Sequence, residues 1–116
     1  MSPTLDVLLV PHTHWDREWY HEAGRFRQRL VALVDELLDA PDGHPFLLDG
    51  QAIVVEDYLD VRPGRRDALA AALRAGRLEA GPWYVLADQL IPSGEAHVRN
   101  LRAGRRVLAA MGAAPP

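Results

Sequence analysis

The feature that most constrains the fold is a short apolar run near the N-terminus that gives way abruptly to polar and aromatic residues. Residues 5–10 are apolar at all but one position, which predicts a strand buried on both faces, as in a parallel sheet. Pro11 ends the run, and His12, His14 and Asp16 follow at alternate positions. Alternate side chains of an extended backbone point to one face. These three are therefore expected to converge at the carboxyl end of the strand, where α/β folds hold their chemistry.

Two imidazoles and a carboxylate on one face make a metal site the first hypothesis for this cluster. The alternative is that the histidines are surface polar groups and that Asp16 caps a turn. The chain has no cysteine, which excludes disulfides and thiolate ligands. A metal would therefore be held by nitrogen and oxygen atoms.

The rest of the chain predicts alternating helices and strands, with the ambiguous residues 51–60 assigned to helix. Gly76 is expected to end one helix as a C-cap glycine, and Ser93 to cap the start of the last helix. We therefore expect an α/β fold whose parallel sheet is built by right-handed crossovers. The predicted helices cover about residues 22–40, 51–60, 65–75 and 93–111, and the predicted strands residues 5–10, 45–49 and 78–86. Residues 1–111 are assigned to one domain and residues 112–116 to a frayed tail.

Two further aspartates follow predicted strands. Asp49 follows the second strand, with an Asx turn onto Gly50 as its alternative role, and Asp88 follows the third, with a turn or helix cap as its alternative. Aromatic residues flank these positions and fit either core packing or a pocket wall that stacks on a sugar ring; they are Trp15, Trp19, Tyr20, Trp83 and Tyr84. Glu56 and Asp57 are interpreted as solvated helix charges.

Length and charge exclude several classes of protein. The chain has 116 residues, whereas a closed eight-stranded α/β barrel needs roughly 250. Its net charge is −3 with the arginines spread along the predicted helices, which argues against a nucleic-acid or anionic-membrane partner. No segment approaches the roughly 20 apolar residues of a membrane span, and the N-terminus lacks the positive region of a secretory signal. A cytoplasmic location is expected.

Several blocks of the sequence, in order, resemble the retaining α-mannosidases of glycoside hydrolase family 38. The first block, HTHWDREW at residues 12–19, is similar to the opening signature of that family. The residues of the Asp-Gly-Gln block (49–51) and of the Gly-Pro-Trp-Tyr block (81–84) are most similar to the bacterial branch that includes mannosylglycerate and phosphomannosylglycerate hydrolases. The other matching blocks are residues 46–51, 56–59, 76–79, 81–85, 88, 93–95 and 99–101.

This resemblance implies the N-terminal portion of a parallel β/α barrel of the glycoside hydrolase/deacetylase type, incomplete in this chain. It implies zinc as the cofactor, with His14, Asp16 and Asp88 as ligands and Asp88 also as the catalytic nucleophile. Trp19 is expected to wall the subsite for the mannose, and Trp83 and Tyr84 to contact substrate. Alternation alone predicts that His12 is a metal ligand equal to His14. The resemblance implies instead that His12 orients a ligand, and Asp49 is expected to have the same supporting role.

In the family, a fourth zinc ligand and an acid/base aspartate come far beyond residue 116. We therefore expect weak zinc binding and absent or very slow hydrolysis by the isolated chain, with an α-mannoside or a mannosylglycerate-type small carbohydrate as the partner. Exposed strand edges also predict self-association as a homo-oligomer. Two alternatives stay open: a fragment of a metal-dependent amidohydrolase or phosphoesterase barrel, and a truncated sugar-binding relic without catalysis.

Overall fold

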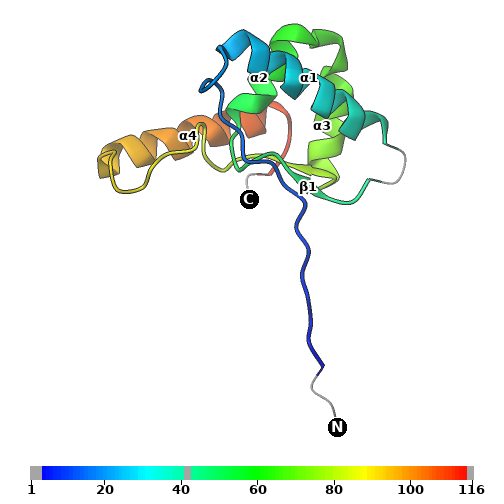
Figure 1. The fold of residues 1–116 in the computed structure, drawn as a ribbon, viewed down its shortest axis with the longest axis horizontal. Helices are drawn as coiled ribbons and strands as arrows, with labels where there is room; N and C mark the ends of the chain where they lie inside the picture. Colours follow the sequence, from blue (N-terminus) through cyan, green and yellow to red (C-terminus); the bar gives the residue numbers. More distant parts are fainter. Residues whose placement is uncertain (1–3, 41–42, 115–116) are drawn as a thin grey trace.

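The computed structural model describes residues 4–40 and 43–114. Its helices and strands alternate as expected for an α/β protein. Helices α1 to α3 gather on one side of the molecule, and α4 extends toward the other (Figure 1). The elements are α1 (Ala23–Asp39), β1 (Phe46–Leu47), α2 (Ile53–Val61), the 3₁₀ helix η1 (Pro63–Arg65), α3 (Arg66–Arg74), β2 (Leu78–Glu79) and α4 (Gly94–Ala110). Residues 41–42, where the first helix was expected to stop, and residues 115–116 of the expected tail lie outside the described residues.

The sheet is parallel and follows the order of the chain. Strands β1 and β2 pair with Phe46 opposite Leu78, and His12 forms a parallel bridge to Leu47 on the other side of β1. The Leu47 N–H donates to the carbonyl of Pro11 at 3.0 Å. Within the described residues, three chain segments thus lie side by side in sequence order, each joined to the next by helical connections.

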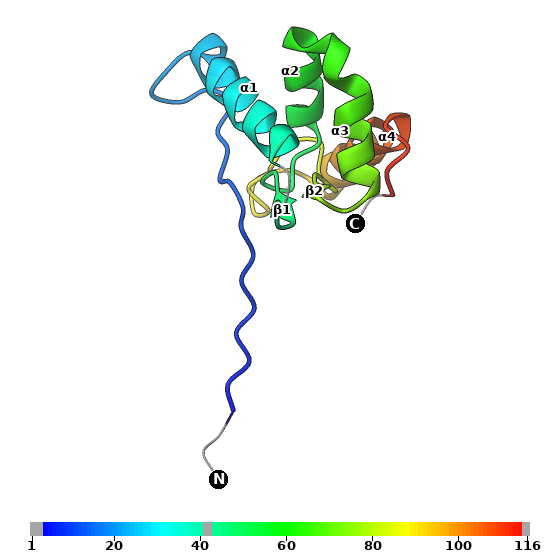
Figure 2. The same cartoon turned by 90° about the vertical axis from the view of Figure 1, so that its right-hand side faces the viewer.

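The prediction of a buried strand at residues 5–10 is wrong. This segment is extended but exposed throughout, and Leu8 is 93% exposed. It runs away from the body of the molecule in both views (Figures 1 and 2). A strand buried on both faces needs neighbouring strands and a covering layer. Within the described residues, the chain reaches β1 only after this segment, where His12 bridges Leu47.

The second and third predicted strands are also shorter than expected. Only Phe46–Leu47 of residues 45–49 and Leu78–Glu79 of residues 78–86 form a ladder. The chain leaves the ladder where the backbone turns through positive φ, at Asp49 (51°) after β1 and at Gly81 (80°) after β2.

The predicted helices are confirmed, including the ambiguous segment that became α2. The apolar positions of α1 recur at helical spacing, and Phe26, Leu30 and Val34 are buried. The start of α2 is fixed by the third chain segment, because the N–H groups of Ala52 and Ile53 donate to the carbonyls of Trp83 and Tyr84.

Both predicted helix caps are present. Gly76 follows α3 with φ of 68°, and the Ser93 hydroxyl accepts a hydrogen bond from the Ala96 N–H.

One hydrophobic core lies between the helices and the sheet. Its fully buried side chains come from four helices and from the residue after β1; the largest are Tyr58, Leu30, Leu48, Leu69, Leu108, Val34, Val54 and Val55. Helix α4 approaches closely at Gly104, where a Cβ atom would lie 2.2 Å from the Pro82 carbonyl oxygen. A glycine is required there, and this contact fixes residues 82–83 against the helix.

Candidate functional site

An open hollow of about 550 Å³ lies at the carboxyl ends of the parallel segments. Asp16 and Asp88 both line it, although they are far apart in the sequence. Asp16 follows the segment that bridges β1, and Asp88 follows the segment that begins with β2. The parallel arrangement therefore brings two of the predicted acidic residues to one surface, as expected for strand ends in α/β folds. The remaining lining residues are Trp15, Arg17, Glu18, Gln51, Val85, Leu86 and Ala87.

His14 lies between two carboxylates. Its Nε2 atom is 3.6 Å from Oδ2 of Asp16, and its Nδ1 atom is 3.9 Å from Oδ1 of Asp49. The His14 ring is largely exposed, whereas Asp49 is nearly buried. Nε2 thus lies toward Asp16, which lines the hollow, and Nδ1 lies toward Asp49; both separations are longer than a hydrogen bond.

Asp49 holds the backbone of the His14 loop. Its Oδ2 atom accepts hydrogen bonds from the Trp15 N–H at 2.6 Å and from Nε2 of Gln51 at 2.8 Å. Asp49 itself lies in the left-handed backbone region, with φ of 51°, which aspartate tolerates better than most residues.

Asp88 and His12 are not drawn into this arrangement. Asp88 is exposed, and its Oδ1 atom accepts from the Leu90 N–H at 3.0 Å, the local turn considered as its alternative role. Nδ1 of His12 is 2.9 Å from the Thr13 carbonyl oxygen, and the ring is exposed. Among residues 4–40 and 43–114, no three metal-binding side chains lie close enough together to hold an ion. The structure therefore brings His14 and Asp16 together and places Asp88 in the hollow that Asp16 lines, whereas His14 is not among the lining residues.

The three aromatic residues expected to contact substrate, Trp19, Trp83 and Tyr84, do not line the hollow. Trp19 is 75% exposed, with its ring edge-on to Tyr20 at 5.6 Å between centroids. Trp83 packs edge-on to His97. The Tyr84 hydroxyl donates to Oε2 of Glu56 at 2.8 Å. This hydrogen bond, with burial, raises the pKa of Tyr84 above its usual range.

The interpretation of Asp57 as a solvated charge is wrong. Asp57 is only 6% exposed, and its carboxylate accepts two hydrogen bonds from Arg17, at 2.7 and 2.8 Å, and one from Arg27 at 3.1 Å. The bond to Asp57 raises the pKa of the Arg17 guanidinium. This ion pair fixes the chain directly after Asp16. The signal for burial was the apolar run at residues 53–55, which leaves little of α2 facing solvent.

Sequence reasoning also missed Asn100, which completes the backbone of the third segment. Its Oδ1 atom accepts from the N–H groups of Tyr84 and Val85, both at 2.9 Å, and its Nδ2 atom donates to the Val85 carbonyl at 2.7 Å. The Asn100 amide thus makes hydrogen bonds to the backbone of residues 84–85 that a neighbouring strand would otherwise make, three residues before Asp88. Its sequence signal was its place in the block 99–101 that resembles family 38; helical periodicity alone does not distinguish it from a surface helix residue.

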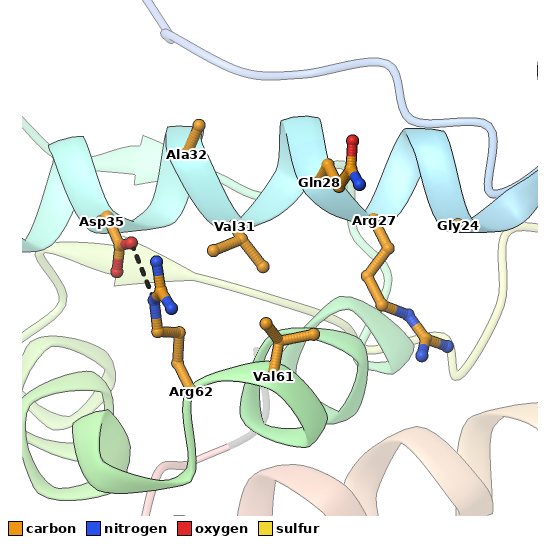
Figure 3. A pocket seen from close by; sticks show the side chains of 8 residues that line it. All are labelled: Gly24, Arg27, Gln28, Val31, Ala32, Asp35, Val61 and Arg62. Carbon is orange, nitrogen blue, oxygen red and sulfur yellow. Dashed lines mark hydrogen bonds and ion pairs between the residues drawn. The ribbon is translucent and has the colours of Figure 1, made fainter.

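A second hollow, of about 570 Å³, lies between α1 and the end of α2 (Figure 3). Val31 of α1 and Val61 of α2 line it and point toward each other, and Arg62 pairs with Asp35 at 3.1 Å beside them (Figure 3). Its described lining contains none of the predicted site residues.

The fold and the strand-end hollow define an α/β protein with acidic side chains at the carboxyl ends of parallel segments, the place where α/β-barrel enzymes hold their active sites. Residues 4–115 match the family model described as "Glycosyl hydrolases family 38 N-terminal domain". The chain belongs to glycoside hydrolase family 38.

Similar proteins support this membership. A protein of Halalkalibacterium halodurans named "Putative mannosylglycerate hydrolase" is 43% identical over 100 residues, which cover 83% of this chain and 11% of that protein. The crystal structure of an α-mannosidase from Enterococcus faecalis superimposes with a TM-score of 0.83 at 42% identity, over 92% of this chain and 12% of that one. A family 38 protein from the same organism gives a TM-score of 0.79 at 38% identity, over 92% of this chain and 13% of the other.

The chain thus spans about an eighth or less of the length of these relatives. Within the part of the chain that the structure describes, no helix is both long enough and apolar enough to cross a membrane.

Proposed function

We propose that this chain supplies the nucleophile side of a zinc-dependent, retaining α-mannosidase-type active site. The observation that carries the proposal is the shared hollow, which Asp16 and Asp88 both line from different parallel segments, with His14 beside Asp16. Membership of family 38 supports the reaction class. The relative named for mannosylglycerate supports a small α-mannoside as the substrate.

The sheet supports a place for this chain at the start of a β/α barrel. The segments at His12, β1 and β2 are parallel and adjacent in chain order, the pattern from which such barrels are built. In that setting the exposed residues 5–10 would continue the first strand.

The side chains near the hollow have the donor types that zinc accepts, although the described residues do not bring three of them within range of one ion. An imidazole next to a carboxylate, with a second carboxylate behind the ring, provides the nitrogen and oxygen ligands that zinc accepts. His14, Asp16 and Asp88 would hold the ion. By resemblance to the family, bound zinc would engage the 2- and 3-hydroxyls of the mannose and favour a distorted ring.

Asp88 would act as the nucleophile. Its carboxylate oxygen would bond to the anomeric carbon of the mannose as the bond from that carbon to the leaving oxygen breaks. The leaving oxygen would take its proton from a second carboxylate, which in retaining enzymes lies roughly 5–5.5 Å from the first. The family places that acid far beyond residue 116. General acid help is worth on the order of 10²–10⁴-fold, so we propose that the isolated chain is inactive.

Zinc titration of the isolated chain tests the proposed site. We expect saturable binding, measured by competition with a chromophoric chelator, that weakens in His14→Ala and in Asp88→Asn. Asp60→Asn, which neutralises an exposed carboxylate on α2, is the matched control and should bind as the wild type does. Equal affinities for Asp88→Asn and the control would contradict the assignment of Asp88. Turnover of an aryl α-mannoside at the rate of a full-length relative would contradict the inactivity.

A further inference from the structure

Gln51 is a buried polar residue whose hydrogen-bonding groups are all directed at the site. It is 3% exposed. Its Nε2 atom donates to the Trp15 carbonyl at 2.7 Å and to Oδ2 of Asp49 at 2.8 Å. Its Oε1 atom accepts from the Leu86 N–H at 3.1 Å. Both amide hydrogens and the amide oxygen are therefore in use.

These bonds connect the two halves of the hollow. Trp15 lies next to His14 and Asp16, and Leu86 lies two residues before Asp88. The connected positions are separated from Gln51 by 36 and 35 residues along the chain. The backbone of Gln51 also forms a parallel bridge to Trp83, so the side chain extends from a fixed position.

We propose that Gln51 is a positioning residue that sets the separation between the His14–Asp16 loop and the Asp88 loop. The positioning role itself is independent of the proposed function; only its expected effect on zinc affinity rests on that function. Few side chains could replace it, because the position needs donors toward Trp15 and Asp49 and an acceptor toward Leu86. A glutamate would place a second carboxylate against Asp49, and a leucine would leave buried backbone groups unpaired.

The distance between the loops can be measured directly because the chain has no cysteine. Glu18→Cys and Gln89→Cys introduce two spin labels at exposed positions, one on each loop. Double electron–electron resonance should give a narrow distance distribution for the otherwise wild-type chain and a broader one with Gln51→Leu. Tyr58→Phe is the matched control, because it removes another buried side-chain bond, the one to Asp35 at 2.6 Å, away from the hollow.

An unchanged distribution with Gln51→Leu, or equal broadening with Tyr58→Phe, would overturn the proposal. If Gln51→Leu does not fold, as judged by circular dichroism, Gln51→Glu takes its place. Gln51→Glu should also broaden the distribution, because a carboxylate keeps an acceptor toward the Leu86 N–H but has no donor for the Trp15 carbonyl or for Asp49. An unchanged distribution in the folded Gln51→Glu variant would also overturn the proposal.

Zinc affinity separates this proposal from the proposed function. With Gln51→Leu we expect zinc to bind about tenfold more weakly, the scale seen when groups that support metal ligands are removed. If the wild-type chain does not bind zinc although the distances respond as expected, the positioning role stands and the metal assignment fails. If zinc binds equally well to both chains and the distances do not respond, the metal assignment stands and the positioning role fails.

Discussion

At the scale of single residues, the ion pair between Arg17 and Asp57 does most to fix the chain after the His14–Asp16 loop. The guanidinium makes two parallel hydrogen bonds to a carboxylate that is almost fully buried. Paired bonds of this kind combine charge with a fixed geometry. Arg27 provides a third bond to the same carboxylate, so Asp57 depends on two cations from two chain segments.

Removing Arg17 should therefore destabilise the protein by more than the loss of a surface charge would. In Arg17→Met the Asp57 carboxylate stays buried with only Arg27 as a partner. Allowing for the partial exposure of Arg17, we expect the free energy of unfolding to fall by about 1–3 kcal/mol. Urea denaturation measures this. The control is Arg99→Met, which removes the exposed ion pair with Glu95 inside α4 and should change stability by less than about 1 kcal/mol. Equal losses in the two variants would contradict the role of Asp57.

Residue spacing predicted only the local part of the site. Alternation predicted that His12, His14 and Asp16 would converge. His14 and Asp16 do lie together, but His12 contacts only the adjacent Thr13 carbonyl. The roles of Gln51 and Asp57 could not be read in this way. Apart from Asp49, which is two residues from Gln51, their side-chain partners are 30 or more residues away. Only the packing of separate elements brings these groups within hydrogen-bonding distance.

At the scale of elements, the docking of α4 positions the segment that leads to Asp88. Gly104 lets the helix backbone approach Pro82 and Trp83, and Asn100 bonds to the backbone one turn earlier. These two residues lie on the same face of the helix, because positions four apart in an α-helix are neighbours. A glycine within a helix costs stability relative to alanine when nothing else requires it; here close contact requires it.

Substituting Gly104 with alanine should show this requirement. A Cβ atom there would lie within 2.8 Å of three backbone atoms of Pro82 and Trp83, which cannot move aside as a flexible side chain could. We expect Gly104→Ala to lower the free energy of unfolding by about 1–3 kcal/mol, as measured by urea denaturation. Gly94→Ala at the start of the same helix meets nothing within 4 Å and should be neutral or slightly stabilising. A neutral Gly104→Ala would contradict the close approach of α4.

Helices were predicted better than strands, for a physical reason. The apolar spacing of α1 and the caps of α3 and α4 are local properties of the sequence. A strand exists only where a neighbour provides a ladder, so an apolar run such as residues 5–10 predicts a strand without ensuring that the partners are present. The same dependence shortened the ladders at β1 and β2.

At the scale of the whole molecule, the chain contains a compact body and an exposed apolar segment. The radius of gyration is 15.6 Å, above the roughly 13 Å expected for a compact domain of this length. Residues 5–10 account for the visible extension, since they run away from the body in both views (Figures 1 and 2). Extended apolar backbone with unpaired N–H and C=O groups is a template for pairing with another chain.

We therefore expect the isolated chain to self-associate through residues 5–10. Light scattering after size-exclusion chromatography should give a mass that rises with concentration. The double substitution Leu8→Asp and Leu9→Asp should shift the chain toward monomer, because it places two charges on side chains that are 93% and 87% exposed and would be buried in a paired sheet. Leu90→Asp is the matched control, because Leu90 is equally exposed but lies in the loop after Asp88. A wild-type chain that stays monomeric at all concentrations would contradict the expectation. If Leu90→Asp shifts the chain toward monomer to the same extent, general surface hydrophobicity, rather than strand pairing by residues 5–10, drives association.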